Sequence, residues 1–453
     1  MKTHTCLVTF FILHSAFSIG ASAIARAQSA DEIASEEKSK IVDGVTSADL
    51  RLSDAKMQWW RDAKFGLFIH WGIYAIPAQG EWYQHNAKIP NEEYAKYAAR
   101  FNPQYFNAAD WAAAAKAAGM KYVVLTTRHH DGFALWDSPA SHGNFTSVKA
   151  APAHRDFVSE YAKAIRAADL RVGFYYSPMD WRFPGYFKPK ELPDNAALMK
   201  KQGYGQVEEL MSRYGKIDIL WYDGGWLAMK GSDADAAWFW EPLKLNTMVR
   251  KYQPDIVISP RSGWEGDFIC NEGGRAVSGP IIKRAWEKCL NLNQTAWGYT
   301  TKRNLMSRDH AIDMFVNVII RGGNMLLNVG PDADGVIPPA DVARLKEIGD
   351  WMRTNSEAIY ATRAGPYEPV DKVCGTTCKG AKFYLHLLNT RGADTELKLP
   401  PLPQKIIRAH LLQGGASVRY EQTKAGVTVT VPPKNGEPDM IVVFEMDKPL
   451  TAE

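Results

Sequence analysis

Among the residues whose type and position could do chemistry, Asp223 is the most informative. It follows the apolar run Ile219-Leu220-Trp221-Tyr222 and precedes Gly224-Gly225-Trp226. The pattern predicts a buried strand over residues 217–223 that ends in a carboxylate. Burying a carboxylate is unfavourable without compensation, and in parallel α/β barrels the carboxyl tips of strands are where catalytic groups lie. Aromatic rings beside an acid also suit a sugar, although Asp223 could instead cap the next helix.

Three histidines follow two earlier apolar runs. His70 follows Phe65-Gly66-Leu67-Phe68-Ile69, and His129-His130 follow Leu125-Thr126-Thr127-Arg128. Three imidazoles at neighbouring strand ends could bind sugar hydroxyls or, alternatively, zinc. Adjacent residues on a strand point to opposite faces, so we expect His129 and His130 to diverge, and the H-E-x-x-H spacing is absent. We therefore favour hydroxyl binding over a metal site.

A cation and several acids come after the next predicted strand. Arg261 opens a glycine-rich segment that contains Glu265 and Glu272, and Glu287 follows shortly after. Cleavage of a glycosidic bond needs one carboxylate as nucleophile or base and one carboxylic acid as proton donor. Asp223 can be the first of these, and the three glutamates compete for the second role. Spacing alone does not choose among them.

The elements that must position these residues alternate between strand and helix from about residue 60 to 360. The patterns predict strands over residues 67–70, 122–126, 172–176, 217–223, 256–259 and 325–329. They predict helices over residues 108–118, 157–168, 206–214, 241–252, 310–321 and 340–355. This alternation indicates parallel strands with right-handed crossovers, in a barrel or an open doubly wound sheet. Chemistry at five successive strand ends and the lack of a G-x-G-x-x-G motif favour a (β/α)8-like TIM barrel, with irregular or missing units allowed.

The pattern changes after about residue 363. Gly365-Pro366 and Pro369 indicate a linker, and short alternating strands are predicted over residues 383–388, 397–399, 406–412, 427–431 and 440–444. Turn-forming residues separate them and no helix pattern appears, which predicts a β-sandwich. We expect a catalytic (β/α) barrel domain over residues 28–364 and a C-terminal β-sandwich domain over residues 365–453.

The first 27 residues have the pattern of a secretory signal peptide. Lys2 is followed by an apolar region, and Ala25-Arg26-Ala27 offers an A-x-A cleavage site. No later segment has about 18 uninterrupted apolar residues, so we expect no membrane anchor. The formal net charge of +4 over 453 residues is small and its basic residues are scattered, which argues against a nucleic-acid partner. Cleavage of the signal peptide would leave four cysteines: Cys270, Cys289, Cys374 and Cys378. Their spacing is not that of a metal site, and whether they form disulfides stays open.

Several segments together resemble the α-L-fucosidases of glycoside hydrolase family 29. The matching segments, in order, are Lys64 to Gly72, Gly80-Glu81-Trp82-Tyr83, His129 to Phe133, Leu220 to Asp223, Trp286-Glu287, Trp297-Gly298-Tyr299 and Gly322 to Pro331. They run from about residue 55 to 365, and an ordered set of this length is specific. The resemblance implies a retaining exo-glycosidase that uses no cofactor, and the missing zinc spacing separately predicts that it needs no metal.

The resemblance also implies roles for single residues. Asp223 matches the nucleophile, and alignment on Arg261 places Glu272 at the acid/base position, while Glu287 falls in a motif that we interpret as structural. Sequence distance, rather than the resemblance, suggests a role for Glu265: it lies four residues after Arg261 and could be its exposed ion-pair partner. The sugar-binding positions fall on His70, Glu81, Trp82, His129, His130, Tyr175, Trp221 and Arg261, and Trp297 matches an aromatic residue near the fucose methyl group.

The sequence therefore predicts an exported α-L-fucosidase that acts on fucosylated oligosaccharides or glycoproteins. The Ala-rich signal favours a bacterial periplasm or secretion over a lysosome. A catalytically silent carbohydrate-binding protein and a metal hydrolase built on His70, His129 and His130 are the alternatives. The linkage that is cut (α1,2, α1,3, α1,4 or α1,6), the aglycone and the oligomeric state, including a homo-oligomer, stay open.

Overall fold

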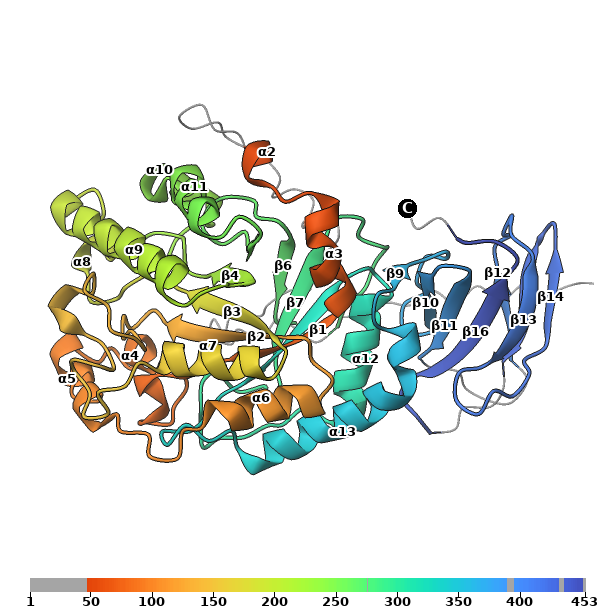
Figure 1. The fold of residues 1–453 in the computed structure, drawn as a ribbon, viewed down its shortest axis with the longest axis horizontal. Coiled ribbons are helices and arrows are strands. Elements are labelled where there is room, and N and C mark those ends of the chain that lie inside the picture. Colours follow the sequence, from red (N-terminus) through yellow and green to blue (C-terminus); the bar gives the residue numbers. More distant parts are fainter. Residues whose placement is uncertain (1–46, 275, 389–394, 432–435, 451–453) are drawn as a thin grey trace, which may run out of the picture.

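The core of the computed structural model is a sheet of eight parallel strands that curves into a barrel (Figure 1). The structure describes residues 47–274, 276–388, 395–431 and 436–450. The strands are β1 (Phe65–Ile69), β2 (Tyr122–Arg128), β3 (Arg171–Tyr176), β4 (Ile219–Tyr222), β5 (Val257–Ile258), β6 (Ile269–Glu272), β7 (Trp286–Asn291) and β8 (Asn324–Val329). Hydrogen bonds join them in the order β5-β4-β3-β2-β1-β8-β7-β6. The predicted barrel fold is confirmed.

Alternation along each strand separates the two layers of the core. On β1, Phe65, Leu67 and Ile69 belong to the apolar layer under the helices, whereas Phe68 belongs to the cluster inside the barrel. Because the side-chain period of a strand is two, His70 follows Phe68 on the inner side. The strand pattern therefore delivers a polar side chain to the barrel mouth on an otherwise apolar face.

Helices cover the outer face of the barrel. The main ones are α3 (Asp54–Ala63), α6 (Ala108–Ala117), α7 (Phe157–Ala167), α9 (Pro193–Arg213), α11 (Pro242–Tyr252), α12 (Arg308–Ile319) and α13 (Pro339–Asn355). Five of the six predicted helices agree to within about two residues at each end, a usual uncertainty for helix boundaries. The sixth prediction, residues 206–214, is too short, because helix α9 already begins at Pro193. Gly203 and Gly205 weaken the helix propensity of the part that was missed, and tertiary packing keeps it helical.

The sequence prediction missed β6 and β7. No strand was predicted in the glycine-rich segment that starts at Arg261, but Glu272 is the last residue of β6, which pairs with β7. Both strands carry polar residues on the inner face, including Glu272 and Glu287, so their apolar pattern is broken. Residues elsewhere in the barrel form hydrogen bonds and ion pairs with these polar side chains and so stabilise them inside it. A local sequence pattern does not reveal such distant partners.

The barrel has a seam between β5 and β6, which are not paired with each other. The Asp267 N–H donates to the carbonyl of Ile258 at 2.9 Å, and its carboxylate accepts the Ile258 N–H at 2.8 Å. The same carboxylate accepts the Leu52 N–H at 2.8 Å and pairs with Arg250 of α11 at 2.7 Å. One buried carboxylate thus joins both edges of the seam to the N-terminal segment and to a covering helix.

The chain after α13 forms two antiparallel sheets, which confirms the predicted β-sandwich. One has the order β13-β16-β11-β10-β9 and the other the order β12-β15-β14. The strands are β9 (Arg363–Ala364), β10 (Cys374–Lys379), β11 (Lys382–Leu387), β12 (Thr395–Leu399), β13 (Ile406–Leu411), β14 (Tyr420–Thr423), β15 (Gly426–Val431) and β16 (Met440–Met446). Phe383 and Phe444 stack at 4.4 Å in a core that includes Val429 from the second sheet.

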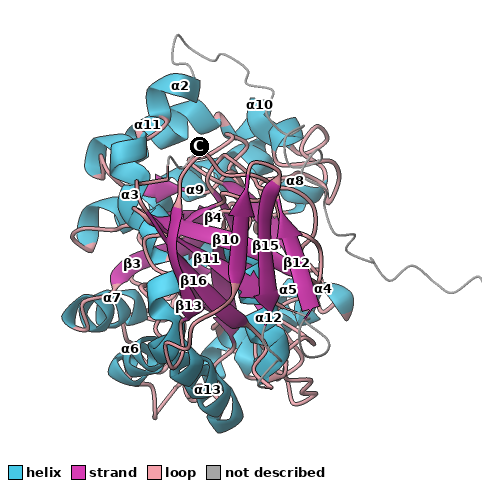
Figure 2. Ribbon diagram, turned by 90° about the vertical axis from the view of Figure 1, so that its right-hand side faces the viewer, coloured by secondary structure: helices cyan, strands magenta, loops and turns pink. Residues whose placement is uncertain are grey.

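The sandwich lies beside the barrel near α12, and Figure 2 shows its strands from that end. A buried chain of hydrogen bonds crosses the boundary: Asp439 Oδ2 lies 2.7 Å from His386 Nδ1, and His386 Nε2 lies 3.0 Å from Thr377 Oγ1. Thr377 donates in turn to the carbonyl of Ala358, just after α13, at 2.8 Å. The four described cysteines carry free thiols. Within the described ranges, no helix combines the length and apolarity needed to span a bilayer.

Replacement of Asp267 by alanine tests the seam. Asp267→Ala removes the acceptor for two backbone N–H groups and leaves the Arg250 guanidinium half-buried without its carboxylate, so the free energy of unfolding should fall by about 3–5 kcal/mol. Urea denaturation measures it. Asp255→Ala is the matched control, because the Asp255–Lys56 pair is largely exposed and should contribute at most about 1 kcal/mol. Equal losses in the two variants would contradict the role assigned to Asp267.

Candidate active site

A cavity opens at the carboxyl ends of the barrel strands. It is lined by Phe68, His70, Trp82, His129, His130, Tyr175, Trp221, Asp223, Trp226, Arg261, Glu272 and Trp297. The structure therefore brings every residue of the expected site to one cavity except Glu81, and it adds Phe68 and Trp226. Phe68 could have been found from the two-residue period that links it to His70, and Trp226 lies in the segment that directly follows Asp223.

Asp223 sits one residue beyond β4 and is held by two donors. The Tyr175 hydroxyl donates to its Oδ2 at 2.8 Å, and Arg261 donates to its Oδ1 at 2.7 Å. Gly224 has a positive φ of 71°, and a Cβ there would lie 2.9 Å from the ring of His130. The glycine after Asp223 thus allows the turn and the close approach of that imidazole.

Arg261 contacts a second carboxylate in the cavity. Its other terminal nitrogen forms an ion pair with Glu272. Burial lowers the pKa of Arg261, but Glu272 and Asp223 outweigh it and raise that pKa well above the ordinary value. The exposed fraction is 37% for the Glu272 side chain and 13% for Asp223. One carboxylate therefore faces the solvent side of the cavity and the other lies deeper.

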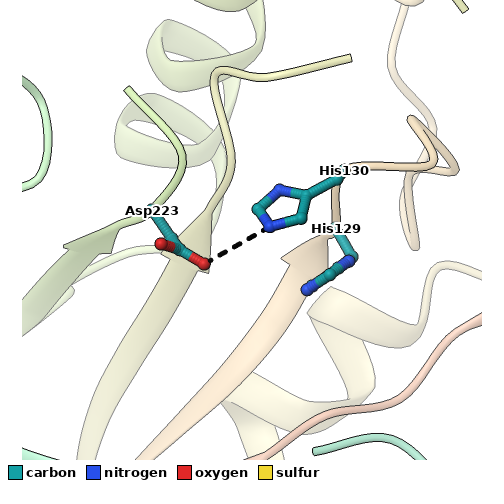
Figure 3. A group of neighbouring side chains, drawn as sticks. All are labelled: His129, His130 and Asp223. Atoms are coloured by element: carbon teal, nitrogen blue, oxygen red, sulfur yellow. Dashed lines mark ion pairs between the residues drawn. The ribbon is translucent and has the colours of Figure 1, made fainter. Parts of the chain in front are cut away.

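His129 and His130 both face the cavity, so the expectation that they diverge is wrong. Strand β2 ends at Arg128, and strand alternation no longer applies to the two residues that follow. Their ring centroids lie 4.0 Å apart, and both imidazoles lie at the tip of β2 opposite Asp223 (Figure 3). His130 Nε2 is 3.6 Å from Asp223 Oδ2, and its Nδ1 is 2.7 Å from the Ser177 hydroxyl.

Burial lowers the pKa of all three histidines in the cavity. The pKa of His70 falls to about 4, and the pKa values of His129 and His130 fall well below the usual range, with Arg128 adding to the effect on His130. The three rings are therefore neutral near pH 7. Neutral imidazoles suit hydrogen bonding to uncharged hydroxyl groups.

Glu81 lies behind the cavity wall. Its Oε2 accepts the backbone N–H of Gly298 at 2.7 Å, next to Trp297. Burial raises its pKa to about 7, although hydrogen bonds from the backbone of Gly298 and Trp297 act in the opposite direction. The structure thus connects Glu81 to the cavity through the Trp297 segment.

Glu287 lies inside the barrel and contacts a cavity residue from behind. Its carboxylate accepts the Trp221 indole N–H at 3.0 Å and the Tyr122 hydroxyl at 2.6 Å. Trp221 in turn stacks on Tyr175, with ring centroids 5.8 Å apart. Burial raises the pKa of Glu287 to about 7. These contacts agree with the structural interpretation of Glu287.

Glu265 is not the exposed ion-pair partner of Arg261 that the sequence suggested. Its side chain is 14% exposed and pairs with Arg51 at 2.6 Å and with Arg284 at 3.8 Å. It also accepts a hydrogen bond from the Ser47 hydroxyl. The residue fastens the N-terminal segment to the seam, because the loop after Arg261 turns this side chain toward α2 (Ser47–Leu50).

His129, His130 and Asp223 are the described residues whose ligand atoms come close enough to hold a metal ion, all within 4.8 Å of one another. Two neutral imidazoles and a carboxylate form a donor set that zinc accepts. The Asp223 carboxylate already pairs with the Arg261 guanidinium at 2.7 Å, and that positive charge opposes a divalent cation at the same group. His70, which the metal-hydrolase alternative requires, is not part of the set.

An eight-stranded parallel barrel with two carboxylates on one arginine, neutral histidines and aromatic walls defines a carbohydrate-active hydrolase. The family model described as Alpha-L-fucosidase matches residues 33–357. Tissue alpha-L-fucosidase of Bos taurus is 33% identical over 362 residues, covering 73% of this chain and 74% of the relative. Plasma alpha-L-fucosidase of Homo sapiens is 33% identical over 340 residues, with coverage of 67% and 69%.

Solved structures agree with these relatives. Alpha-L-fucosidase isoenzyme 1 from Paenibacillus thiaminolyticus has a TM-score of 0.76 and 35% identity, covering 87% of this chain and 99% of that chain. A trapped covalent intermediate of an alpha-L-fucosidase from Bacteroides thetaiotaomicron has a TM-score of 0.78 and 30% identity, with coverage of 87% and 97%. The chain belongs to the alpha-L-fucosidase family, and the predicted retaining fucosidase function is confirmed.

The raised pKa of Glu287 predicts a pH-dependent difference in stability. The folded protein binds more protons at this group than the unfolded chain does between about pH 4.5 and 7, so the stabilisation is lost as pH rises through about 7. Glu287→Gln does not titrate. Its free energy of unfolding relative to the wild type should therefore increase from pH 5 to pH 8, by about 1–3 kcal/mol.

Urea unfolding at pH 5, 6.5 and 8 measures this difference. Glu347→Gln is the control, because that side chain is half exposed and pairs with Arg344 at the surface. A difference for Glu287→Gln that stays constant with pH would show that the Glu287 pKa is not raised.

Proposed function

We propose that Asp223 is the nucleophile and Glu272 the acid/base of this α-L-fucosidase. The observation that carries the proposal is the shared guanidinium: Arg261 contacts both carboxylates in a cavity at the carboxyl ends of the strands. Retaining glycosidases use two carboxyl groups in this way, one to attack the sugar and one to transfer protons. The deeper position of Asp223 suits attack on a bound sugar, and the more exposed Glu272 suits the leaving-group side.

The reaction runs in two displacements. Asp223 attacks the anomeric carbon while the bond to the glycosidic oxygen breaks, and Glu272 gives its proton to the departing oxygen. Glu272 then takes a proton from water, whose oxygen attacks the same carbon and releases Asp223. Hydrogen bonds from Tyr175 and Arg261 fix the orientation of the Asp223 carboxylate for attack.

The remaining cavity residues bind the sugar in this proposal. The neutral rings of His70, His129 and His130 hydrogen-bond its hydroxyl groups, with Trp82 beside His130 at a centroid distance of 5.3 Å. Trp297 and Phe68, whose centroids lie 6.0 Å apart, form an apolar wall for the methyl group. Glu81 acts through the Trp297 segment, whose N–H groups it holds.

We also propose the wider organisation expected from the sequence. The signal peptide over residues 1–27 lies outside the described residues, and export to a periplasm or to the medium stays a prediction from the A-x-A pattern. The division into a barrel domain (28–364) and a sandwich domain (365–453) is supported by the change from parallel to antiparallel strands, which begins at β9 (Arg363–Ala364), just before that boundary. Substrates are fucosylated glycans, with the linkage and the oligomeric state left to experiment.

The nucleophile assignment predicts that Asp223→Gly is nearly inactive. With Glu272 assigned to proton transfer, the described residues that line the cavity offer no other carboxylate to form the glycosyl–enzyme. Turnover of an aryl α-L-fucoside should therefore fall by about 10³-fold or more. Azide should restore part of that activity by attacking in place of the carboxylate. Near-normal turnover would refute the assignment, and an inactive wild-type protein that still binds fucose would instead favour the carbohydrate-binding alternative.

The acid/base assignment predicts a dependence on the leaving group. Glu272→Ala should lose about 10²–10⁴-fold on natural glycans but much less on aryl fucosides whose leaving groups need little protonation. Rates on both substrate types measure the contrast. Glu265→Ala is the control and should affect both equally, since Glu265 pairs with Arg51 and Arg284. Leaving-group dependence in Glu287→Ala but not in Glu272→Ala would reverse the assignment.

A further inference from the structure

Asn328 belongs to the motif Gly322 to Pro331, for which the proposed reaction has no role. It lies on β8, opposite Phe68 of β1 in the strand register, and is 1% exposed. It does not line the cavity. Its side chain nevertheless contacts His70, which does.

Three hydrogen bonds settle the orientation of the Asn328 amide. Its Nδ2 donates to the backbone carbonyl of Trp297 and to Asn291 Oδ1, each at 2.8 Å. A backbone carbonyl can only accept, so the atom that faces it must be the NH₂ group. The Asn328 Oδ1 therefore faces His70 Nδ1, at 2.7 Å.

This orientation decides the tautomer of His70. The amide oxygen of Asn328 has no proton, so His70 Nδ1 must donate to it. A neutral imidazole carries one proton, which leaves a lone pair on Nε2, the nitrogen away from Asn328. Burial lowers the pKa of His70 to about 4, in keeping with a neutral ring.

We propose that Asn328 is a positioning residue that holds His70 in the Nδ1-protonated tautomer, so that Nε2 accepts a hydrogen bond from one hydroxyl of the bound sugar. The inference rests on the sugar-binding role proposed for His70. It specifies the chemistry at that position: the sugar must present a donor. A fluorine in place of that hydroxyl would set a weak acceptor against the Nε2 lone pair.

Asn328 also links this acceptor to the aromatic wall. The same NH₂ group holds the carbonyl of Trp297, whose ring lies 5.1 Å from that of His70. Asn291 of β7 accepts the second hydrogen bond from this NH₂ group. The hydroxyl acceptor and the proposed methyl-binding wall are thereby kept in one fixed relation by a residue that touches neither sugar group.

The wild-type enzyme provides the first test. Nitrogen-15 spectra of histidine-labelled protein distinguish the two tautomers, and comparison with His70→Gln identifies the His70 signals. We expect a protonated Nδ1, an unprotonated Nε2, and a shift of the Nε2 signal on addition of L-fucose. A protonated Nε2 overturns the proposal. An unprotonated Nε2 that does not respond to fucose overturns the acceptor role alone, and the Asp223 and Glu272 variants would still test the reaction independently.

The second test is Asn328→Asp, which places a carboxylate against His70 Nδ1. The titratable groups around His70 are His129, His130, Tyr175 and Asp223, and the variant adds a new negative charge to them. It should raise the pKa of His70 by about one unit or more, and the protonated ring has no lone pair with which to accept a hydrogen bond from a hydroxyl group. The acidic limb of the pH profile of kcat/KM should therefore move to higher pH by a similar amount.

Asn324→Asp is the matched control. Asn324 lies on the same strand, about 13 Å along it, and its NH₂ group likewise donates to a backbone carbonyl, that of Trp60, at 2.7 Å. This variant has the same charge change and loses a similar bond, so a purely structural effect would appear in both. A shifted acidic limb in Asn328→Asp alone supports the proposal, and unshifted or equally shifted limbs in the two variants overturn it.

Discussion

The interaction on which the active site depends is the contact of one guanidinium with two carboxylates. Asp223 and Glu272 come from β4 and β6, and without a cation their charges would repel each other in a partly desolvated cavity. Arg261 reaches both because it lies on the segment between β5 and β6, where the barrel strands do not pair. Asp267, on the same segment, closes that seam with hydrogen bonds to Ile258. The irregular part of the barrel therefore carries its most important cation.

Around this charged group the cavity is neutral. Burial lowers the pKa of the three histidines, so they are hydrogen-bonding groups rather than additional cations. Their rings are oriented from behind: Ser177 contacts His130, and Asn328 contacts His70. Glu287 does the same for Trp221, and Glu81 for the Trp297 segment. The side chains that line the cavity are thus held by buried polar groups, among which Ser177, Asn328, Glu287 and Glu81 do not line it.

Local sequence patterns predict the regular part of this arrangement well and the polar part poorly. The apolar runs before His70 and Asp223 have the period of strands, and both residues lie at strand ends and line one cavity. Strands β6 and β7 were missed because Glu272 and Glu287 interrupt the apolar pattern. The partner of Glu272, Arg261, lies on the segment after β5, and the partners of Glu287, Tyr122 and Trp221, lie on other strands. Adjacent His129 and His130 were expected to diverge because strand alternation was extended past the real end of β2 at Arg128.

The sequence by itself determined the alternation of strands and helices, the position of Asp223 at a strand tip and the family. These properties depend on short-range periodicity and on ordered motifs, which can be read without contacts. Tertiary structure alone decided that Glu272 rather than Glu265 shares Arg261, that both adjacent histidines face the cavity, and that Asn328 sets the proton on His70. Each of these depends on groups more than ten residues apart, or on where a strand stops, and the hydrogen bonds and burial that decide them exist only once the barrel is closed.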